Sequence, residues 1–448
     1  MSFLNHLFGS TQSLDDNQEV ESESGSSRLG NSIFCALCVA PFLILGMVIM
    51  VGWNEKRAVC EERAIIQGKN EVDKIKCTDT TSSDGGLVML SCDLDPDSVT
   101  LLSLPAGTDF STLSVQGTGL KVTAEMYQCE ETVTSKTQKN AVGGGTTTVK
   151  TYTYSKAWKS YRVDSGSFRK KDSDDFRKNC NTENPPWPSA VPESGTKYGK
   201  TAKVGSFTIE NELVQKVPLD ADVNNFSAPL NWTKSSSYYE SSKWEVSSTG
   251  AAAGIGQVRV QLRTNDWSEP TATVLGKNTK GTINKWTADD SWGCSGFTLH
   301  DLRMGVKDKD TLFEELEGES TFTTWAVRLL GFLVLWCAFS LCAAPLEVVA
   351  DCIPFVGPYL GDAIEAIACV VCCCPACACC LGVAGLVWVA MRPMIGIPLM
   401  LIFICTMGGM IALKCYSKRK KEEEKKEEEK KEKPLEDVVV MGIPVEKE

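Results

Sequence analysis

The chain has 448 residues and a formal net charge of −11, and 43% of its residues are hydrophobic. Phosphate binding needs a basic face, so this acidic balance argues against nucleic acid as the main partner. The mean hydropathy of −0.10 averages two regimes, since residues 53–324 are largely polar whereas 326–413 are almost free of charge. Such an uneven distribution argues against a simple pair of soluble domains.

The first hydrophobic segment covers residues 33–52 and contains no charged side chain. As a helix it is long enough to cross a hydrocarbon core of roughly 30 Å. A cleaved signal peptide fits less well, because residues 1–32 form a long, Ser-rich, acidic leader and no small-residue cleavage site follows the segment. We therefore predict a polar leader over 1–32 and a transmembrane helix over 33–52.

The C-terminal region 325–413 carries three further hydrophobic stretches. Long apolar runs without amphipathic alternation favour lipid over a soluble helical core. Prolines and acids predict a turn or an interfacial segment over 347–362, and Met391-Arg392-Pro393 predicts a tight hairpin. The three predicted spans are about 329–349, 364–390 and 395–413.

Lysine and arginine near the span ends predict the orientation. Lys414 and residues 418–421 follow the last span, which places the charged tail 414–448 in the cytosol or nucleoplasm. Four spans return the N-terminus to the same side. Residues 53–324 are then expected in the lumen, although Lys56 and Arg57 oppose this locally.

Cysteines and glycosylation motifs fit a lumenal placement of residues 53–324. Six of the 20 cysteines fall there, an even number that suits disulfides in an oxidising compartment, with all pairings open. Asn225 and Asn231 begin N-glycosylation motifs in the same region. The disulfide candidates are Cys60, Cys77, Cys92, Cys129, Cys180 and Cys294.

A cysteine-rich run lies in the third predicted span. Two members have CxxC spacing, but a zinc site normally needs a second ligand pair and polar surroundings, and here the neighbours are apolar. Packing as small hydrophobic side chains is the main interpretation, and S-acylation near the cytosolic surface is the alternative. The acylation candidates are Cys372, Cys373 and Cys374.

The polar region is predicted to be rich in β-structure. Residues 146–158 alternate β-branched or aromatic side chains with polar ones, as a half-buried strand does. Residues 121–133 and 258–263 show similar patterns, and the glycines at 143–145 predict a hairpin loop. Residues 184–192, rich in proline, are expected to form an extended connector.

No catalytic motif accompanies these strands. His300 precedes Asp301, but no GxSxG or cysteine-nucleophile motif is present, so we expect His300 at the surface. Trp53 and Trp325 are expected to mark the membrane boundary. Arg328 is expected to extend to lipid headgroups. Pairing with Glu347 is disfavoured, because the two residues lie at opposite ends of one span.

Several ordered motifs resemble those of the transmembrane protein 43 (LUMA) family over about residues 50–413. Lys56 departs from the family's glycine, and Cys129 stands where relatives tend to carry tryptophan. Tyr127–Glu131, Tyr152–Trp158 and Asn184-Pro185 follow in the family's order. The motif residues that flank the spans are Asn54, Glu55, Arg57, Ala58, Trp325, Arg328, Gly331, Arg392 and Pro393.

The resemblance implies a protein of the endoplasmic reticulum and inner nuclear membrane with a large lumenal loop. It also implies self-association into a homo-oligomer and the organisation of nuclear-envelope proteins such as lamins and emerin.

We therefore predict an α+β membrane protein with four transmembrane helices, one N-terminal and three C-terminal, and a large β-rich lumenal domain. Its expected function is a non-enzymatic scaffold in the lipid bilayer, without cofactor or metal. The alternatives are a lipid-handling or transport protein of the endomembrane system and a cell-surface receptor-like protein.

Overall fold

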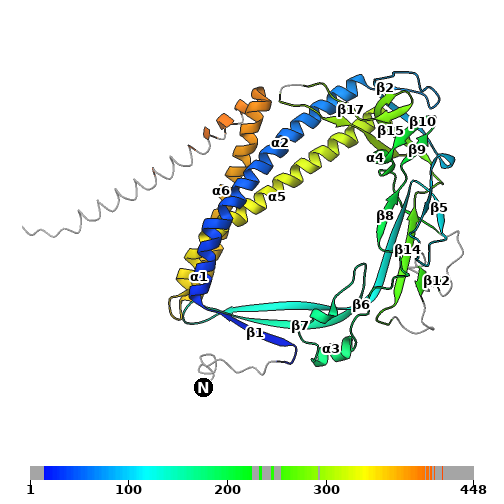
Figure 1. Cartoon of the computed structure of the whole chain (residues 1–448). Helices are drawn as coiled ribbons and strands as arrows, with labels where there is room; N and C mark the ends of the chain where they lie inside the picture. Colours follow the sequence, from blue (N-terminus) through cyan, green and yellow to red (C-terminus); the bar gives the residue numbers. More distant parts are fainter. Residues whose placement is uncertain are drawn as a thin grey trace, which may run out of the picture.

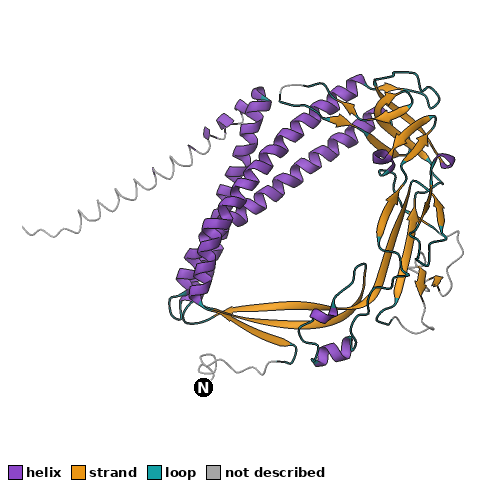
Figure 2. Cartoon of the chain, viewed as in Figure 1, coloured by secondary structure: helices purple, strands orange, loops and turns teal. Residues whose placement is uncertain are grey.

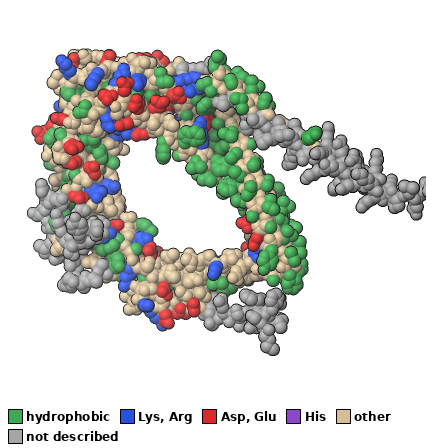
Figure 3. Space-filling view, turned by 180° about the vertical axis from the view of Figure 1, so that it is seen from behind, with side chains coloured by type: hydrophobic (Ala, Val, Ile, Leu, Met, Phe, Trp, Pro, Cys, Tyr) green, Lys and Arg blue, Asp and Glu red, His purple; other side chains and the backbone are tan. Residues whose placement is uncertain are grey.

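The computed structural model describes residues 15–223, 232–234, 244–246, 254–290 and 293–398, with a few positions up to residue 416. Three long helices form one side of a ring, and two β-sheets and a long hairpin complete it (Figures 1 and 2). The space-filling view leaves an opening through the middle of this ring (Figure 3). The predicted α+β class, with a β-rich region, is confirmed.

The first long helix runs without a break from Gly25 to Glu71, over 47 residues. It consists of α1 (Gly25–Phe34), the π-turn η1 (Cys35–Val39) and α2 (Ala40–Glu71). Ser24 caps its start, where its hydroxyl accepts a hydrogen bond from the amide of Ser27 at 3.3 Å. The segment predicted over 33–52 lies inside this helix.

The helix does not begin after residue 32 or end at residue 52, where the sequence placed the boundaries of the first span. Residues 18–23 form strand β1 (Gln18–Glu23), and α1 already begins at Gly25. Beyond Trp53 the helix continues because residues 54–71 are rich in strong helix formers such as Ala, Glu, Lys and Arg. The continuation also buries Ala64 and Ile65 against the sheets.

The other two long helices are α5 (Lys309–Asp351) and α6 (Gly357–Met391). α5 continues through Pro345, so the predicted connecting segment over 347–362 shrinks to a turn between Asp351 and Gly357. A proline inside an apolar helix frees one carbonyl, and neighbouring groups can satisfy it in lipid.

Arg392 interrupts the helix after Met391, at the predicted hairpin. A shorter apolar helix, Pro393–Ile402, follows. Nine of the 19 residues of the fourth predicted span (395–413) lie outside the described residues, and so does the charged tail apart from a single position.

Each of the three long helices is long and apolar enough to cross a membrane. Large apolar side chains cover their outer surface, among them Phe42, Val370 and Leu381, which are 77%, 71% and 62% exposed. Figure 3 shows this apolar surface along the bundle, in contrast to the mixed charges of the β-sheet sides. A contiguous exposed apolar surface of this kind marks a membrane or protein contact.

The larger sheet has the strand order β1-β7-β6-β14-β13-β12. In addition, β8 pairs with β6 and β11 pairs with β14. The predicted strands at 121–133, 146–158 and 258–263 lie within β6, β7 and β14. The strands of this sheet other than β1 are β6 (Gly119–Lys139), β7 (Thr146–Lys159), β8 (Gly195–Tyr198), β11 (Ala221–Asp222), β12 (Trp232–Lys234), β13 (Trp244–Val246) and β14 (Val258–Thr264).

The second sheet has the order β19-β15-β16-β10-β9-β3-β2. Its core continues into the helices, because Leu87 and Leu275 pack with Ile65 of α2 and Phe313 of α5. Its strands are β2 (Asp73–Lys74), β3 (Leu87–Asp95), β9 (Thr201–Val204), β10 (Phe207–Glu210), β15 (Thr271–Thr279), β16 (Thr282–Asn284) and β19 (Asp301–Met304).

Smaller elements complete the β part, which we call the frame (residues 73–308). They are β4 (Leu101–Ser103) with β5 (Ser114–Gln116), β17 (Trp286–Thr287) with β18 (Thr298–Leu299), and the short helices α3 (Asp174–Asn179) and α4 (Asn211–Val214).

The β6–β7 hairpin changes character along its length. The first half of β6 alternates buried and exposed side chains, whereas the residues after Glu131 are mostly exposed up to Lys139. The hairpin turns at the predicted glycine loop, where Gly143 and Gly144 have φ values of +84° and +65°. Its distal half therefore leaves the core and reaches the far end of the helices (Figure 1).

All six cysteines of the polar region form disulfides in the structure. The pairs are Cys60–Cys294, Cys77–Cys92 and Cys129–Cys180.

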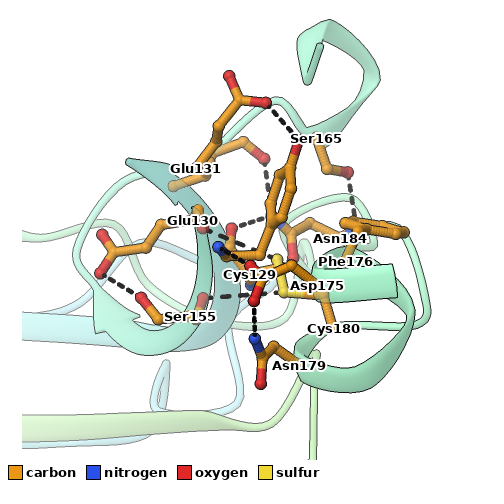
Figure 4. Close-up of a disulfide and its surroundings, with 12 residues drawn as sticks. Cys129, Glu130, Glu131, Ser155, Ser165, Asp175, Phe176, Asn179, Cys180 and Asn184 are labelled. Atoms are coloured by element: carbon orange, nitrogen blue, oxygen red, sulfur yellow. Dashed lines mark hydrogen bonds between the residues drawn. A yellow bond between two sulfur atoms is a disulfide. The ribbon is translucent and has the colours of Figure 1, made fainter. Parts of the chain in front are cut away.

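The third disulfide ties β6 to the end of α3 (Figure 4). Cys180 follows α3, and Asp175 of that helix accepts a hydrogen bond from the Tyr154 amide of β7 at 2.8 Å. The buried Asn184 side chain bonds both the amide and the carbonyl of Cys129, at 2.7 and 2.8 Å. The connector predicted over 184–192 has no regular structure, but its first residue is thus held tightly.

Candidate functional site

A buried carboxylate joins the three long helices where the apolar part of α2 ends. Glu55 has a fully buried side chain, and Arg328 of α5 binds it with two hydrogen bonds of 2.6 Å. The indole of Trp388 on α6 donates to the same carboxylate at 2.9 Å. A buried charge is costly unless it is paired, and the bidentate arginine geometry is among the strongest pairings available. One side chain thus fixes α2, α5 and α6 to one another.

Aromatic rings complete the surroundings of the arginine. The Arg328 guanidinium lies 4.7 Å from the Trp325 ring centroid and 6.0 Å from that of Trp388. The prediction that Arg328 extends to headgroups is wrong, because its bonds to Glu55 point it into the bundle. Glu347, the weighed alternative, pairs with cations at the opposite end of α5.

A second set of hydrogen bonds continues from Glu55 along α2 and α5. Asn54 is buried and donates to the backbone carbonyl of Thr324 at 3.2 Å. Arg57 donates to the Asn54 side chain at 3.2 Å and to the Thr324 hydroxyl at 3.3 Å. Glu61 accepts from Arg57 at 2.5 Å and from Ser320 at 2.6 Å. We call the residues Asn54, Glu55, Arg57, Thr324, Arg328 and Trp388 the boundary cluster.

Other residues singled out in the sequence lie around the boundary cluster. A Cβ on Gly331 would lie 2.6 Å from Val51, so glycine permits the close approach of α5 to α2. Arg392 forms an ion pair with Glu62 at 2.5 Å.

The remaining motif residues lie nearby. Ala58 and Trp325 line a shallow cavity beside Trp388. Pro393 begins the last described helix.

The disulfide Cys60–Cys294 lies next to the boundary cluster and ties α2 to the frame. Arg63, one turn further, donates to the carbonyl of Met391 at the end of α6, at 2.5 Å. No local sequence signal indicates this contact, since 328 residues separate its partners. The ends of the helices are therefore fixed both to one another and to the frame.

The acylation candidates lie elsewhere. Cys372 is buried, Cys373 is half-buried and Cys374 is exposed, all near the middle of α6. They lie at least 15 residues, or roughly 22 Å along the helix axis, from either end of the helix. Their acylation stays a prediction. Within the described part of the chain, no group of three or more His, Cys, Asp or Glu side chains could hold a metal ion.

His300 is not the surface residue that the sequence indicated. Its side chain is largely buried, and its Nδ1 lies 3.3 Å from a carboxylate oxygen of Glu212. Burial lowers the pKa of His300, and a hydrogen bond with the backbone of Ile283 and the charge of Glu212 oppose this only in part. The glycosylation candidates Asn225 and Asn231 lie outside the described residues.

These features define a class of protein. An exposed apolar bundle of three helices, joined by a buried ion pair and rooted in a disulfide-linked frame, is an integral membrane protein with a large domain outside the lipid. The family model described as Transmembrane protein 43 matches residues 126–393, more than half of the chain. The chain therefore belongs to the transmembrane protein 43 family, as the motifs predicted.

The matched residues include Trp325, Arg328, Gly331 and Arg392, whereas the first helix lies before them. No curated protein and no solved structure matches the chain.

Proposed function

We propose that this protein is a non-enzymatic membrane scaffold that self-associates and organises membrane or nuclear-envelope protein complexes. The observation that carries this proposal is the buried Glu55–Arg328–Trp388 junction. A scaffold must hold its surfaces at fixed positions relative to the membrane, and this junction, with the neighbouring disulfide, fixes the helices to the frame.

The proposed location is the endoplasmic reticulum and the inner nuclear membrane, with the frame in the lumen. The three disulfides support a lumenal frame, because disulfides persist in oxidising compartments. Membership of the family supports the choice of membrane and the lamin- or emerin-like partners.

Cross-linking in native membranes tests self-association. The wild-type chain is expected to give dimers or larger species, and Arg328→Ala fewer of them, because the helices lose their common junction. Lys56→Ala is the matched control, since Lys56 is the exposed neighbour of Glu55 on α2. Recovery of wild-type monomer alone would contradict the proposal.

Lipid handling is a second candidate, favoured by a groove of about 410 Å³ between α5 and α6. Small and apolar side chains line it, with Glu347 and Glu365 beside them. Ala344 and Ala368 face the groove, so Trp substitutions there would fill it. Lipid movement between liposomes that the wild-type chain promotes and these variants lose would favour this function over the scaffold.

A further inference from the structure

A second charged cluster closes the ring at the other end of the helices. Asp351, at the end of α5, has a side chain only 1% exposed and lies 3.0 Å from Arg28 and 3.2 Å from Lys139. Lys139 also pairs with Glu347 and Asp362, both at 2.8 Å. We call these five residues the clasp cluster.

The lysine of the clasp cluster is firmly charged. Burial by itself would lower the pKa of Lys139, but hydrogen bonds to Asp362, Glu347 and Asp351 together outweigh burial and raise it. The hairpin tip therefore contacts the bundle as a cation among three carboxylates.

Backbone contacts also join the start of α1, the hairpin loop and the turn between α5 and α6. The amide of Phe355, in the turn after α5, donates to the carbonyl of Ala141 at 2.9 Å. Arg28 donates to the carbonyl of Gly144 at 2.6 Å. Gly25 lies so close to the glycine loop that a Cβ there would collide with the Gly143 carbonyl.

Strand β1 also pairs with the hairpin. It lies antiparallel to β7, in a register that runs from Gln18 opposite Thr151 to Glu23 opposite Thr146. The hydroxyl of Tyr152 donates to Glu19 at 2.7 Å. Leader, hairpin tip and α5–α6 turn thus meet at one place (Figure 1).

The two clusters lie one membrane thickness apart along the helices. From Arg328 to Asp351, α5 advances 23 residues, or roughly 35 Å, against a hydrocarbon core of about 30 Å. If the bundle stood upright across a bilayer, the boundary cluster and the clasp cluster would lie on opposite faces.

The hairpin cannot follow an upright bundle through the lipid. Its distal half is largely polar, with charged side chains at Glu131, Lys136 and Lys150. There the β6 residues are mostly exposed and the β7 residues half-buried. With β1 it forms a sheet with open edges, whose unpaired backbone groups hydrocarbon cannot satisfy. Since the hairpin begins in the frame and ends in the clasp cluster, both must lie in water on one side.

We infer that α1–α2, α5 and α6 are embedded from a single face of the membrane, and that the leader strand shares one aqueous compartment with the frame. The bundle then contacts the acyl chains of that leaflet through its exposed apolar side chains (Figure 3). The leader strand does not lie across the membrane from the frame, as the four-span prediction required.

Cysteine labelling in sealed vesicles tests this topology. Single reporters are placed at exposed positions of the leader strand, the hairpin tip and the frame, as Ser22→Cys, Val142→Cys and Lys200→Cys. The background is Cys352→Ser, which removes the free cysteine of the α5–α6 turn. A membrane-impermeant maleimide is applied before and after permeabilisation.

All three reporters are expected to show the same accessibility: either all are labelled before permeabilisation, or all are labelled only after it. Labelling of Ser22→Cys from the face opposite to Lys200→Cys would overturn the inference. Each substitution is at an exposed position, and retention of the Cys60–Cys294 disulfide reports a folded chain.

Cross-strand disulfide formation in intact membranes is an independent test. Ser22 and Thr147 are register partners, so Ser22→Cys with Thr147→Cys is expected to give a linked peptide by mass spectrometry after oxidation. Ser22→Cys with Thr151→Cys is the matched control, four positions out of register. A linked peptide no more abundant than in the control would overturn the inference, whatever the cross-linking of whole chains shows.

Discussion

The boundary cluster and the clasp cluster bury a carboxylate at opposite ends of the same bundle, but their partners differ. Glu55 is satisfied by Arg328 and Trp388, which both belong to the bundle. Asp351 is satisfied by Arg28 and by Lys139, which the frame supplies from the tip of a long hairpin. The first cluster therefore holds helices to one another, whereas the second holds the bundle to the frame.

The difference has an energetic consequence. Within the described part of the chain Glu55 pairs with one cation, Arg328, so the loss of Arg328 leaves a buried carboxylate without a cationic partner. The clasp cluster has two cations and three carboxylates, and Asp362 is largely exposed. One cation can therefore be lost there with part of the pairing kept.

The largest effect is expected from Arg328→Ala. Breaking a buried ion pair by removing one partner costs about 3–5 kcal/mol, because the remaining charge is uncompensated. Thermal unfolding in detergent, read against Lys56→Ala, measures the loss. The double variant Glu55→Leu/Arg328→Leu is expected to recover part of it. Equal stability of Arg328→Ala and Lys56→Ala would remove the energetic distinction between the clusters.

A smaller and more local effect is expected from Lys139→Met. We expect a loss of about 1.5–3 kcal/mol, the range for hydrogen bonds to charged groups, because Arg28 still pairs with Asp351. Hydrogen exchange should speed up at residues 18–23 and 139–146 and stay unchanged at 54–61. Faster exchange at both ends of the bundle would mean that the two clusters are one cooperative unit.

Two glycines of α1 give a matched pair for the clasp side. Gly25→Ala is expected to displace the glycine loop at a cost of about 1–3 kcal/mol, as overpacking does. Gly30→Ala meets nothing within 4 Å and should stabilise the helix by roughly 0.5–1 kcal/mol. Exchange rates of residues 140–146 distinguish the two. Similar exchange rates in both variants would show that the close packing of Gly25 does not hold the glycine loop in place.

The smallest effect is the pH dependence of the stabilisation by Lys139, which an arginine at this position should not show. The raised pKa of Lys139 means that its stabilisation is fully present below the pKa of an unfolded lysine, about 10.4, and is lost as pH rises through the higher folded value. The exchange difference between wild type and Lys139→Met should therefore stay constant from pH 7 to 10. Lys139→Arg should keep the ion pairs of the clasp cluster, and therefore slow hydrogen exchange, over the whole pH range. A difference that already falls below pH 9 would contradict the raised pKa.

Local sequence was sufficient for much of the fold. Alternation at 146–158 predicted β7, and the glycines at 143–145 predicted its loop, because strand periodicity and left-handed backbone are set by neighbouring residues. Hydropathy located the three long helices, although not their ends. The helices extend past the apolar segments because helix propensity and burial against the frame do not stop where hydrophobicity does.

The candidate site was predicted only in part. The motif residues Glu55 and Arg328 were identified, but their contact was not, since 273 residues separate them. Lys139 and Asp351 belong to no motif, and only the path of the hairpin brings them together. A charged side chain in a sequence does not specify its partner, because each carboxylate could pair with many cations until the backbone excludes the rest.

The sequence by itself determined that this protein has long apolar helices, a β-rich polar region with an even number of cysteines, and membership of the transmembrane protein 43 family. The tertiary structure alone decided that both ends of the helical bundle contact the frame. The reason is physical, because hydrophobic periodicity acts over a few residues, whereas ring closure depends on a strand of 21 residues, roughly 69 Å long, that returns a single lysine to a buried aspartate.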